Sequence, residues 1–588
     1  MVNAEIAWLR RTAPLLPATG LLTFLFLIPV LGLLALSVLS SDGGLSLEHY
    51  RRLFATKSYV DSLGTTLKIS TWTALLSVGL GYPLAYFIAR QRLSIGGLLM
   101  LGVLIPYWSG VLLRTFAWLV LLGRRGPVNG TLTQLGIVDA PVQFLFHTGG
   151  VLLGMVNAYV PIAVLLMTSA MQSIDRRLET AAATMGAGAA QSFWRVYLPL
   201  SMPGVAAALL LVFISSLGTF ITPALLGSGR EVMIAQVIID QVEQLLNWGF
   251  AGAVAMLLLV VTLAVFILFN ALFGASALLG RGAAPRMTRL GRLSGAAGRA
   301  IVGTLGSAFD RIEALLPQRP AQRRGGNFAL AIVALAVLAV LIVPALFLVP
   351  ISFTGGSFME WPPRNFSLRW YEMVLTSDQW LRAAIRSLVV GIATALLSVL
   401  IGLPAAMAFT RGAFRGRTAL LGFVLSPMII PHILIAVALF YLFARTGLVG
   451  TNLGLILGHT VVCLPYTVIA LMAVLSTYDR RLDQAADTLG ASTWQRVWLI
   501  TLPLIRPGLA AAFLIAFVTS FEELTIAMFV TGGLTATLPK QLWSEMLMAA
   551  SPALAAVSTV MLVFISAVIV FAYLLRSRAS AGGGAPNI

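Results

Sequence analysis

Residues 175–204 read DRRLETAAATMGAGAAQSFWRVYLPLSMPG, and residues 479–508 read DRRLDQAADTLGASTWQRVWLITLPLIRPG. When they are aligned without a gap, at an offset of 304, the two stretches share 16 of 30 residues. This identity is greater than shared composition would give, so the chain contains an internal repeat. The duplicated stretch is polar and charged, although most of the chain around it is apolar.

Composition assigns the chain to a class. Of its 588 residues, 59% are hydrophobic and only 10% are charged, and the mean hydropathy is +0.94. A soluble protein of this size needs more polar surface, so the chain is a polytopic membrane protein. Its apolar runs are long enough for helices that cross a bilayer, and they lack the alternation of a membrane β-barrel. We therefore expect an all-α fold.

The apolar runs predict about twelve transmembrane helices, arranged as two parallel six-helix repeats. The predicted spans lie near 15–39, 63–89, 96–122, 150–173, 201–225 and 248–273, and then near 328–353, 383–410, 417–443, 453–475, 507–530 and 551–575. This divides the chain into a first half (1–274), a basic linker (275–326) and a second half (327–588). Two halves with the same orientation are related by an approximate two-fold axis along the membrane normal, so a transport pathway is expected where they meet.

The positions of the arginines predict the orientation. Most of them fall on the side of the two termini, and positive loops stay in the cytoplasm. This places both termini in the cytoplasm and accounts for the net charge of +18 without nucleic acid. Outer loops also carry some positive charge, for example at Arg51 and Arg52. The arginines on the inner side are Arg90, Arg92, Arg176, Arg177, Arg411, Arg415, Arg417, Arg480, Arg481, Arg576 and Arg578.

Each copy of the duplicated stretch lies between the fourth and fifth spans of its half, on the cytoplasmic side. Its apolar residues recur at helical spacing, so each copy contains a short amphipathic helix. Asp175 and Asp479 are suited to its start, and Gly186 and Gly490 to the left-handed residue that ends it. Pro203 and Pro507 are expected where the next membrane helix begins. The apolar residues are Leu178, Ala181, Ala182 and Met185, then Leu482, Ala485, Ala486 and Leu489.

We interpret the two helices as docking elements for one partner with two equivalent sites. A face of alanines permits a close approach, and the flanking charges fix the orientation. The alternative is a helix that lies among lipid headgroups, but the agreement of the two copies in register favours a specific protein. The candidate docking residues are Asp175, Arg176, Arg177, Glu179, Ala181, Ala182 and Gly186, together with Asp479, Arg480, Arg481, Asp483, Ala485, Ala486 and Gly490.

The duplicated loop resembles the EAA loop of ABC importer permeases of the MetI-like type. In that family the loop forms a coupling helix that seats on a cytoplasmic ATPase. The alanine pairs and the glycines stand in register with the family pattern, but the glutamate does not. Thr180 and Gln484 take its place, and the acid lies one residue earlier, at Glu179 and Asp483.

The resemblance extends over most of both halves. Residues 105–123 (IPYWSGVLLRTFAWLVLLG) and 217–227 (LGTFITPALLG) are similar to the first permease of spermidine/putrescine-type importers, and 426–460 and 517–533 to the second. The resemblance implies a type I ABC importer permease in a bacterial inner membrane, with two subunits fused in one chain. It also implies two copies of a cytoplasmic ATPase and one extracytoplasmic solute-binding protein as partners.

The chain has no ATP-binding motif of its own. A phosphate-binding loop needs Gly-Lys followed by Ser or Thr, and of the three lysines only Lys57 precedes a serine, with Thr56 before it. We therefore expect no catalytic residue and no cofactor here, with ATP and Mg²⁺ bound by the partner ATPase. The single cysteine, Cys463, excludes a cluster of thiolate ligands, and no metal site is expected.

An ion-gradient-driven secondary transporter is the alternative, because Glu522 and Glu523 lie within a predicted span and intramembrane acids can relay protons. The aligned positions of the first half are Gly218 and Thr219, which carry no acid. The duplicated cytoplasmic loops also favour the ATP-driven interpretation, since a secondary transporter has no need of two docking helices.

Few residues are candidates for the substrate path. Charged groups in a membrane usually face a cavity or a partner, and aromatic faces can hold an ammonium group. The acids favour a cationic solute, and a polyamine is the first choice. An organic phosphonate, an opine or other amino compound, or ferric iron remain alternatives. His432, after Pro431, marks a predicted helix break within the span 417–443, and Arg114 is the candidate contact for an anionic group. The candidate residues are Trp108, Arg114, Trp118, His432, Glu522 and Glu523.

Overall fold

The computed structural model is helical over the residues it describes. Its only β pairing among them is an isolated bridge between Leu39 and Leu45, which confirms the all-α fold. The predicted linker at 275–326 lies almost entirely outside the described residues, so the division into two sequence halves and a linker stays a prediction. The described residues are 12–39, 44–273, 325–359, 361–363, 365–412, 414–532 and 535–582.

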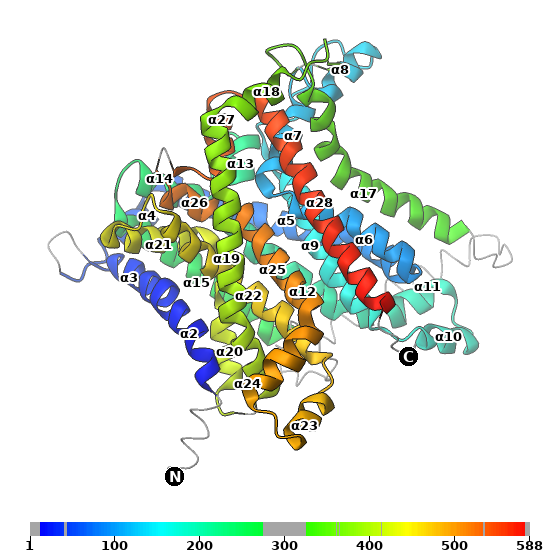
Figure 1. Cartoon of the computed structure of the whole chain (residues 1–588). Coiled ribbons are helices and arrows are strands. Elements are labelled where there is room, and N and C mark those ends of the chain that lie inside the picture. Colours follow the sequence, from blue (N-terminus) through cyan, green and yellow to red (C-terminus); the bar gives the residue numbers. More distant parts are fainter. Residues whose placement is uncertain are drawn as a thin grey trace. The chain divides into compact units, whose positions relative to one another are not determined.

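Figure 1 labels the helices. Those before the undescribed segment are α2 (Leu16–Leu22), α3 (Ile28–Leu36), α4 (Glu48–Ala55), α5 (Lys57–Arg90), α6 (Leu93–Trp108), α7 (Val111–Leu122), α8 (Pro127–Gln134), α9 (Thr148–Gln172), α10 (Arg177–Thr184), α11 (Ala189–Gln191), α12 (Leu198–Leu217), α13 (Ile221–Leu226), α14 (Ile234–Glu243) and α15 (Trp248–Phe273).

The helices after that segment follow a similar order. They are α17 (Gly325–Ser352), α18 (Arg369–Thr376), α19 (Asp378–Arg411), α20 (Arg417–Leu425), α21 (His432–Thr446), α22 (Asn452–Ser476), α23 (Arg481–Thr488), α24 (Thr493–Arg496), α25 (Leu502–Phe521), α26 (Thr525–Val530), α27 (Leu538–Met548) and α28 (Pro552–Gly582).

The sequence repeat is also a structural repeat. Helices α9 and α22 have bounds displaced by 304 residues at both ends, and the same displacement relates α10 to α23, α12 to α25, and α13 to α26. The cap of α9 is His147, which accepts from the Gly149 amide, and the matching cap of α22 is Thr451, which accepts from the Gly454 amide. Equal helix lengths at equal spacing give the two halves the same local architecture.

The number of spans agrees with the prediction, but two of them are not straight. Among the described residues, ten helices are long and apolar enough to cross a membrane, and two more candidates are bent pairs. The predicted span 96–122 is therefore wrong as a single helix, since it bends by 90°, whereas the 91° bend in 417–443 falls at the predicted break. Gly110, at φ +73°, breaks the first, and Pro431, which has no amide donor, lies just before α21 in the second.

The fifth span of each half also differs from the prediction. The predicted spans 201–225 and 507–530 are each divided in two, with breaks after Leu217 and Phe521. Their start is wrong as well, because α12 and α25 begin at Leu198 and Leu502, and Pro203 and Pro507 lie inside them. A π-helical turn precedes each (Ser192–Tyr197 and Val497–Thr501), so the helix enters the bundle without a break.

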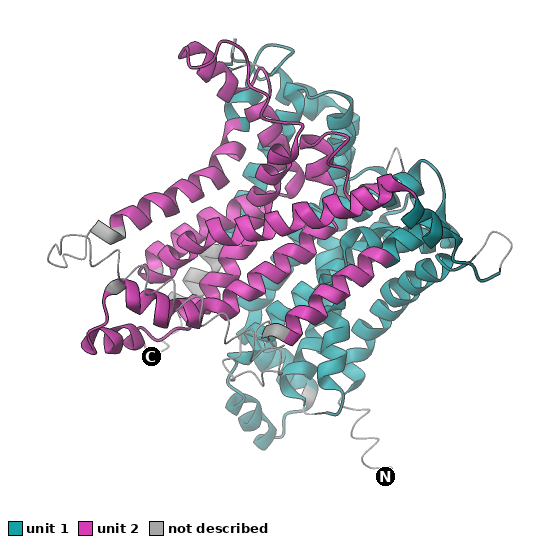
Figure 2. Cartoon of the chain, turned by 180° about the vertical axis from the view of Figure 1, so that it is seen from behind, with its two compact units in different colours: residues 1–55, 238–256, 348–588 teal, residues 56–237, 257–347 magenta. Residues whose placement is uncertain are grey.

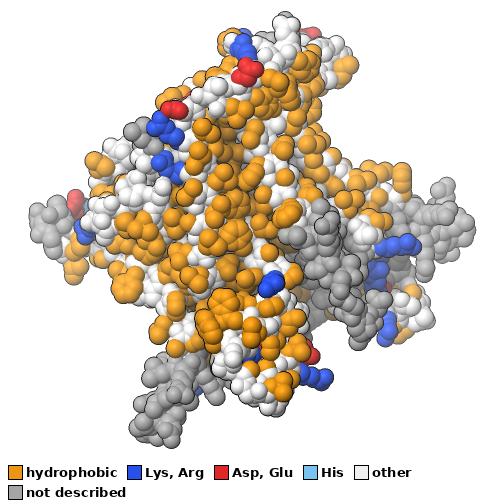
Figure 3. Space-filling view, viewed as in Figure 1, with side chains coloured by type: hydrophobic (Ala, Val, Ile, Leu, Met, Phe, Trp, Pro, Cys, Tyr) orange, Lys and Arg blue, Asp and Glu red, His pale blue; other side chains and the backbone are white. Residues whose placement is uncertain are grey.

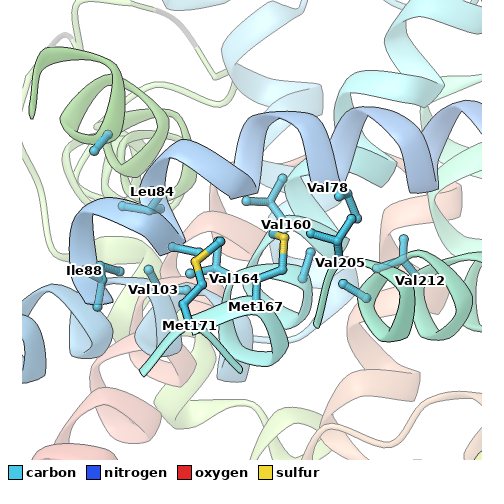
Figure 4. Packing of buried hydrophobic residues seen from close by; sticks show 14 of the residues in the cluster. Val78, Leu84, Ile88, Val103, Val160, Val164, Met167, Met171, Val205 and Val212 are labelled. Atoms are coloured by element: carbon cyan, nitrogen blue, oxygen red, sulfur yellow. The ribbon is translucent and has the colours of Figure 1, made fainter. Parts of the chain in front are cut away.

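The core of the first bundle is made by α5, α9 and α12. Val78 from α5, Met167 from α9 and Val205 from α12 meet in one buried cluster (Figure 4). The glycine that ends the duplicated stretch permits this packing: a Cβ at Gly204 would lie 2.5 Å from the Ala170 side chain. In the second half, a Cβ at Gly508 would lie 2.4 Å from Val474. Close approach of helices therefore explains why this glycine occurs twice.

The chain forms two compact units, which are coloured in Figure 2. Unit 1 contains residues 1–55, 238–256 and 348–588, and unit 2 contains residues 56–237 and 257–347. The first span of each half thus packs among helices of the other half. In unit 1, α3 packs against α21; in unit 2, the Asn157 side-chain amide donates to the Val340 carbonyl of α17 at 2.9 Å.

The outer surface has the character expected of a membrane protein. Hydrophobic side chains are spread over the whole face shown in Figure 3, and charged ones are few. Leu396 and Leu400 of α19 are 58% and 72% exposed, and Ile267 of α15 is 65% exposed. Large exposed apolar side chains on long helices are stable when lipid tails, rather than water, surround them.

Candidate functional site

The two duplicated loops form the same structure. α10 and α23 are eight-residue helices, and in each the side chain of the preceding aspartate accepts a hydrogen bond at 2.9 Å, from the amide of Arg177 or Arg481. Each helix ends before a left-handed glycine, with φ +87° at Gly186 and +79° at Gly490. The predicted helix, its aspartate at the start and its glycine at the end are therefore confirmed.

The second residue of each copy ties the loop to the end of a long helix. The Arg176 guanidinium donates to the Ala89 carbonyl of α5 at 2.9 Å, and Arg480 donates to the Thr410 carbonyl of α19. Carbonyls in the last turn of a helix have no intrahelical donor and attract cations. This arginine therefore positions the short helix beneath the long one in both units.

Glu179 and Asp483, which lie one residue before the position of the family's glutamate, also bind the long helices. Glu179 forms an ion pair with Arg90, the last residue of α5. Asp483 forms an ion pair with Arg411, the last residue of α19, at 3.1 Å between Nη2 and Oδ2. The Tyr478 hydroxyl also donates to Asp483 at 2.8 Å. Both acids thus face their own unit rather than solvent.

Sequence reasoning missed Arg90 and Arg411 as members of the site. A signal was present, because each directly follows the predicted end of the second span of its half. Their guanidiniums also lie over aromatic rings, at 4.3 Å from the Tyr86 ring centre and 5.5 Å from the Tyr478 ring centre. Sequence position does not reveal that a span end and a loop 70–90 residues later meet.

The apolar stripe of each short helix is divided between two directions. Ala182 and Ala486 are buried against their own units, so the alanine pair does not form one exposed face. The rest of the stripe is exposed to nearly equal extents in the two copies: Leu178 is 46% and Met185 86% exposed, and Leu482 is 44% and Leu489 87% exposed. Two equal apolar patches, bordered by the exposed Arg177 and Arg481, are available to a partner.

Arg114 is buried in unit 2, and backbone carbonyls receive its hydrogen bonds. It donates to Gly110 and Tyr107, beside the bend before α7, at 3.1 and 3.4 Å. It also donates to Ala158 and Asn157 of α9, at 3.0 and 3.4 Å. The Asn157 carbonyl lies four residues before Pro161, which has no amide to offer it. Arg114 therefore satisfies carbonyls that the two helix irregularities leave open.

The other aromatic and histidine candidates occupy different places. Trp118 is buried in a cluster with Leu121 and Leu226, so it contributes to the core of unit 2. Trp108 is half-buried at the end of α6, directly before the bend. His432 begins α21 after the bend at Pro431, as the sequence predicted. Trp108 and Trp118 belong to unit 2, and His432 belongs to unit 1.

Glu522 and Glu523 lie at the break between α25 and α26, not inside a continuous span. Glu523 is buried, and its carboxylate accepts hydrogen bonds from the Ile526 amide, at 2.9 and 3.0 Å, and from the Ala527 amide, at 3.1 Å. Its Oε2 lies 3.5 Å from Nε2 of His459, whose Nδ1 is 2.8 Å from the Ser520 hydroxyl. Glu523 thus caps α26, a role for which its negative charge is suited.

The capping role predicts different effects for the two acids. We expect Glu523→Ala to lower the free energy of unfolding by about 1–3 kcal/mol, because two buried amides lose their acceptor. Glu523→Gln should cost less, since its amide oxygen still accepts. Glu522→Ala is the matched control, and equal losses for Glu522→Ala and Glu523→Ala would contradict the capping role. Thermal unfolding in lipid nanodiscs measures all three variants.

Comparison with known proteins places the chain in a family. The family model described as "Binding-protein-dependent transport system inner membrane component" matches residues 18–275 and 398–580, which is more than half of the chain. The match occurs twice, in agreement with the internal repeat. This confirms that both halves derive from the same kind of membrane unit.

Individual relatives match one half each. The spermidine/putrescine transport system permease protein PotB of Haemophilus influenzae is 33% identical over 257 residues, which are 42% of this chain and 90% of that protein. The corresponding protein PotC of Escherichia coli is 33% identical over 254 residues, which are 43% of this chain and 95% of that protein. These relatives are permease subunits, not enzymes.

Among solved structures, a bacterial alginate ABC transporter in complex with a periplasmic protein that binds an alginate pentasaccharide is 20% identical, with a TM-score of 0.40. The match covers 46% of this chain and 94% of that one. The double family match and the two sets of relatives are sufficient: the chain belongs to the binding-protein-dependent transport system inner membrane family and is an ABC importer permease in which two permease subunits are joined.

Proposed function

We propose that the chain imports a polyamine such as spermidine or putrescine into the cytoplasm, by alternating access powered by two copies of a separate ATPase. The observation that carries the ATPase interaction is the pair of equal, exposed apolar patches on α10 and α23. Two equivalent patches fit two identical subunits. ATP and Mg²⁺ are bound by that partner, and no cofactor is assigned to this chain.

The coupling residues are those of the duplicated loops, to which the structure adds Arg90 and Arg411. Leu178, Met185, Leu482 and Leu489 contact the ATPase, and Gly186 and Gly490 hold each helix end in the shape that it recognises. Arg90 and Arg411 join each coupling helix to a helix of 34 residues, α5 or α19. A displacement of α10 or α23 is thereby transmitted along the membrane helix, because an ion pair and a backbone hydrogen bond connect them.

The proposed orientation places both termini and both loops in the cytoplasm of a bacterium. An extracytoplasmic solute-binding protein then delivers the solute from the other side, as the family description implies. The arginines at the inner ends of the spans support this orientation.

The solute assignment is supported by the relatives, whose names specify spermidine and putrescine, and by the acids at the break after α25. Glu523 caps α26, and we assign the contact with a cationic solute to Glu522, because acids within the membrane region usually face a cavity or a partner. Trp108 and His432, each beside a helix bend, are the other candidates for the path. Arg114 and Trp118 have structural roles that account for them.

Uptake of labelled spermidine tests the proposed function. Proteoliposomes would contain the full chain with its ATPase, and the binding protein would be supplied on the opposite side. We expect spermidine uptake that unlabelled putrescine inhibits and that an organic phosphonate, an opine and ferric iron do not. Uptake of one of these three solutes instead of spermidine would contradict the polyamine assignment.

The acids give a variant for the same assay. Glu522→Gln should lower spermidine uptake by about tenfold, the effect of losing roughly 1.4 kcal/mol of attraction for the cation, while stimulated ATP hydrolysis continues. Glu523→Gln is the control, because its amide oxygen can still cap α26, and adding it to Glu522→Gln should lower uptake little further. Unchanged uptake by the Glu522→Gln variant would remove this acid from the path.

A further inference from the structure

A polar cavity of about 580 Å³ lies in unit 2 near the start of α9. Helix α9 has 25 residues, a length of about 37 Å, and α10 follows its other end. The cavity is therefore separated from the coupling helix by the length of a membrane span. In the proposed orientation it lies on the extracytoplasmic side.

The charge that this cavity offers to a ligand is positive. Lys68 and Arg230 line it and are exposed, and neither forms an ion pair within the part of the chain that the structure describes. The one acid in the lining, Glu231, is buried and accepts from the Ser228 amide at 2.9 Å, the Ser228 hydroxyl at 2.6 Å and the Thr148 hydroxyl at 2.9 Å.

Hydrogen bonds keep the Glu231 carboxylate ionised and engage its oxygens. Burial alone would raise the pKa of Glu231, but the hydrogen bonds from Ser228 and Thr148 outweigh it and lower the pKa. His147 also lines the cavity. Its Nδ1 accepts from the Gly149 amide at 3.0 Å, so the neutral ring carries its proton on Nε2 and is a donor. Lys68, Arg230 and His147 together make a lining that suits a carboxylate.

Phe146, at the edge of the cavity, has an unusual backbone. Its φ is +63°, a conformation that bulky residues rarely adopt, and its side chain is 51% exposed. The matching residue of the second half, at the offset of 304, is Gly450, with φ +77°. The two amides make the same contact, from Phe146 to the Leu226 carbonyl at 2.8 Å and from Gly450 to the Val530 carbonyl at 2.7 Å.

The turn therefore does not need a phenylalanine, because glycine makes it in the other half without strain. Strained residues of this kind cluster at binding sites. The charged lining is also specific to the first half. Lys68 corresponds to Val389, from the displacement of 321 between the starts of α5 and α19, and His147 corresponds to Thr451. Neither feature is thus required by the repeated fold.

We propose that the cavity and Phe146 form the docking point of the extracytoplasmic binding protein on the first half of the chain. The partner surface carries an aspartate or glutamate that enters between Lys68 and Arg230, next to an apolar side chain that covers Phe146. An exposed aromatic beside an arginine is the composition of an interface hot spot. A free anion would use the cations but not the phenylalanine. The proposal rests on the proposed function, since it requires binding-protein-dependent import.

The decisive variant is Phe146→Gly, which installs the residue of the second half. The full chain, in lipid nanodiscs, would be titrated with the binding protein that sustains spermidine uptake by the unaltered chain. We expect docking about tenfold weaker and an unfolding temperature that is unchanged or higher, because glycine relieves the strained turn. If Phe146 only supported the fold, the variant would dock normally and its unfolding temperature would fall. Ile137→Gly, at a residue 63% exposed and outside the cavity lining, is the matched control and should dock normally.

The charges have a test of their own. Lys68→Gln combined with Arg230→Gln should weaken docking and reduce its dependence on salt, since steering between opposite charges is screened by ions. Full-strength docking by both the Phe146→Gly and the Lys68/Arg230 variants would overturn the proposal. Sulfate binding that only the charge variant loses, with docking intact, would make the cavity a small-anion site and would also overturn it.

Failure of the proposed function gives a different result. If no binding protein stimulates the unaltered chain, import by this route is refuted and the docking point with it. If the unaltered chain is stimulated and the variants dock as tightly as it does, only the docking point is refuted.

Discussion

Replacing both loop glycines, by Gly186→Val and Gly490→Val, is expected to reduce uptake strongly while the chain stays folded and the ATPase continues to hydrolyse ATP. Both glycines have a positive φ, which costs a residue with a Cβ about 1–2 kcal/mol. A β-branched residue is the least tolerant of this backbone. The helix end will therefore change shape, and the exposed Met185 and Leu489 just before it will move.

The free energies predict the size of this effect. A distortion of about 1.4 kcal/mol changes an equilibrium about tenfold, and the two loops act together, so uptake should fall by well over tenfold. Gly188→Ala is the control, because Gly188 lies in the same loop but does not have a positive φ. Uptake and phosphate release would be measured on the same proteoliposomes. Normal coupling in the double valine variant would count heavily against the docking role of these loops.

Reversing the charge of Arg411, by Arg411→Glu, has the second largest expected effect. The new carboxylate would face Asp483, and both positions are less than a quarter exposed. Loss of a hydrogen-bonded charge pair at such a site costs about 2–5 kcal/mol. We expect α23 to detach from the end of α19 and ATP-driven uptake to fall by at least about tenfold.

A double variant with exchanged charges distinguishes loss of the Arg411–Asp483 ion pair from general damage to the fold. Combining Arg411→Asp with Asp483→Arg should restore most of the uptake, because the pair is rebuilt with its charges exchanged. The first-half pair, Arg90 with Glu179, is more exposed, so Arg90→Glu should have a smaller effect. Arg382→Glu is the control on the same helix, since the Arg382–Asp378 pair is mostly exposed. A double variant as inactive as the single one would contradict the link.

Local patterns predicted much of this structure. Apolar runs gave the number of spans and most of their bounds, since burial in lipid demands a minimum helix length. The offset of 304 residues in the sequence also relates the bounds of the repeated helices. The left-handed conformation of Gly186 and Gly490 follows from their place after a short helix. Each of these features depends on neighbouring residues in the sequence.

The features that the sequence did not reveal depend on contacts between distant segments. The sequence makes Arg114 a candidate contact for an anion, but Arg114 binds carbonyls left open by a bend and by Pro161. The sequence makes Glu523 a candidate contact for the solute, but its carboxylate caps α26. The bend between α6 and α7 is not evident from the sequence, because an apolar run gives the same signal whether its helix is straight or bent, whereas Pro431 indicates the bend between α20 and α21.

In the proposed mechanism, ATP hydrolysed by a partner that docks at α10 and α23 drives transport. Labelled spermidine uptake should be measured in proteoliposomes that contain the full chain, with and without its ATPase, and with either ATP or an imposed proton gradient. We predict uptake only when the ATPase, ATP and the binding protein are all present. Full uptake by the chain alone, driven by the proton gradient, would contradict the account and would make the chain a secondary transporter.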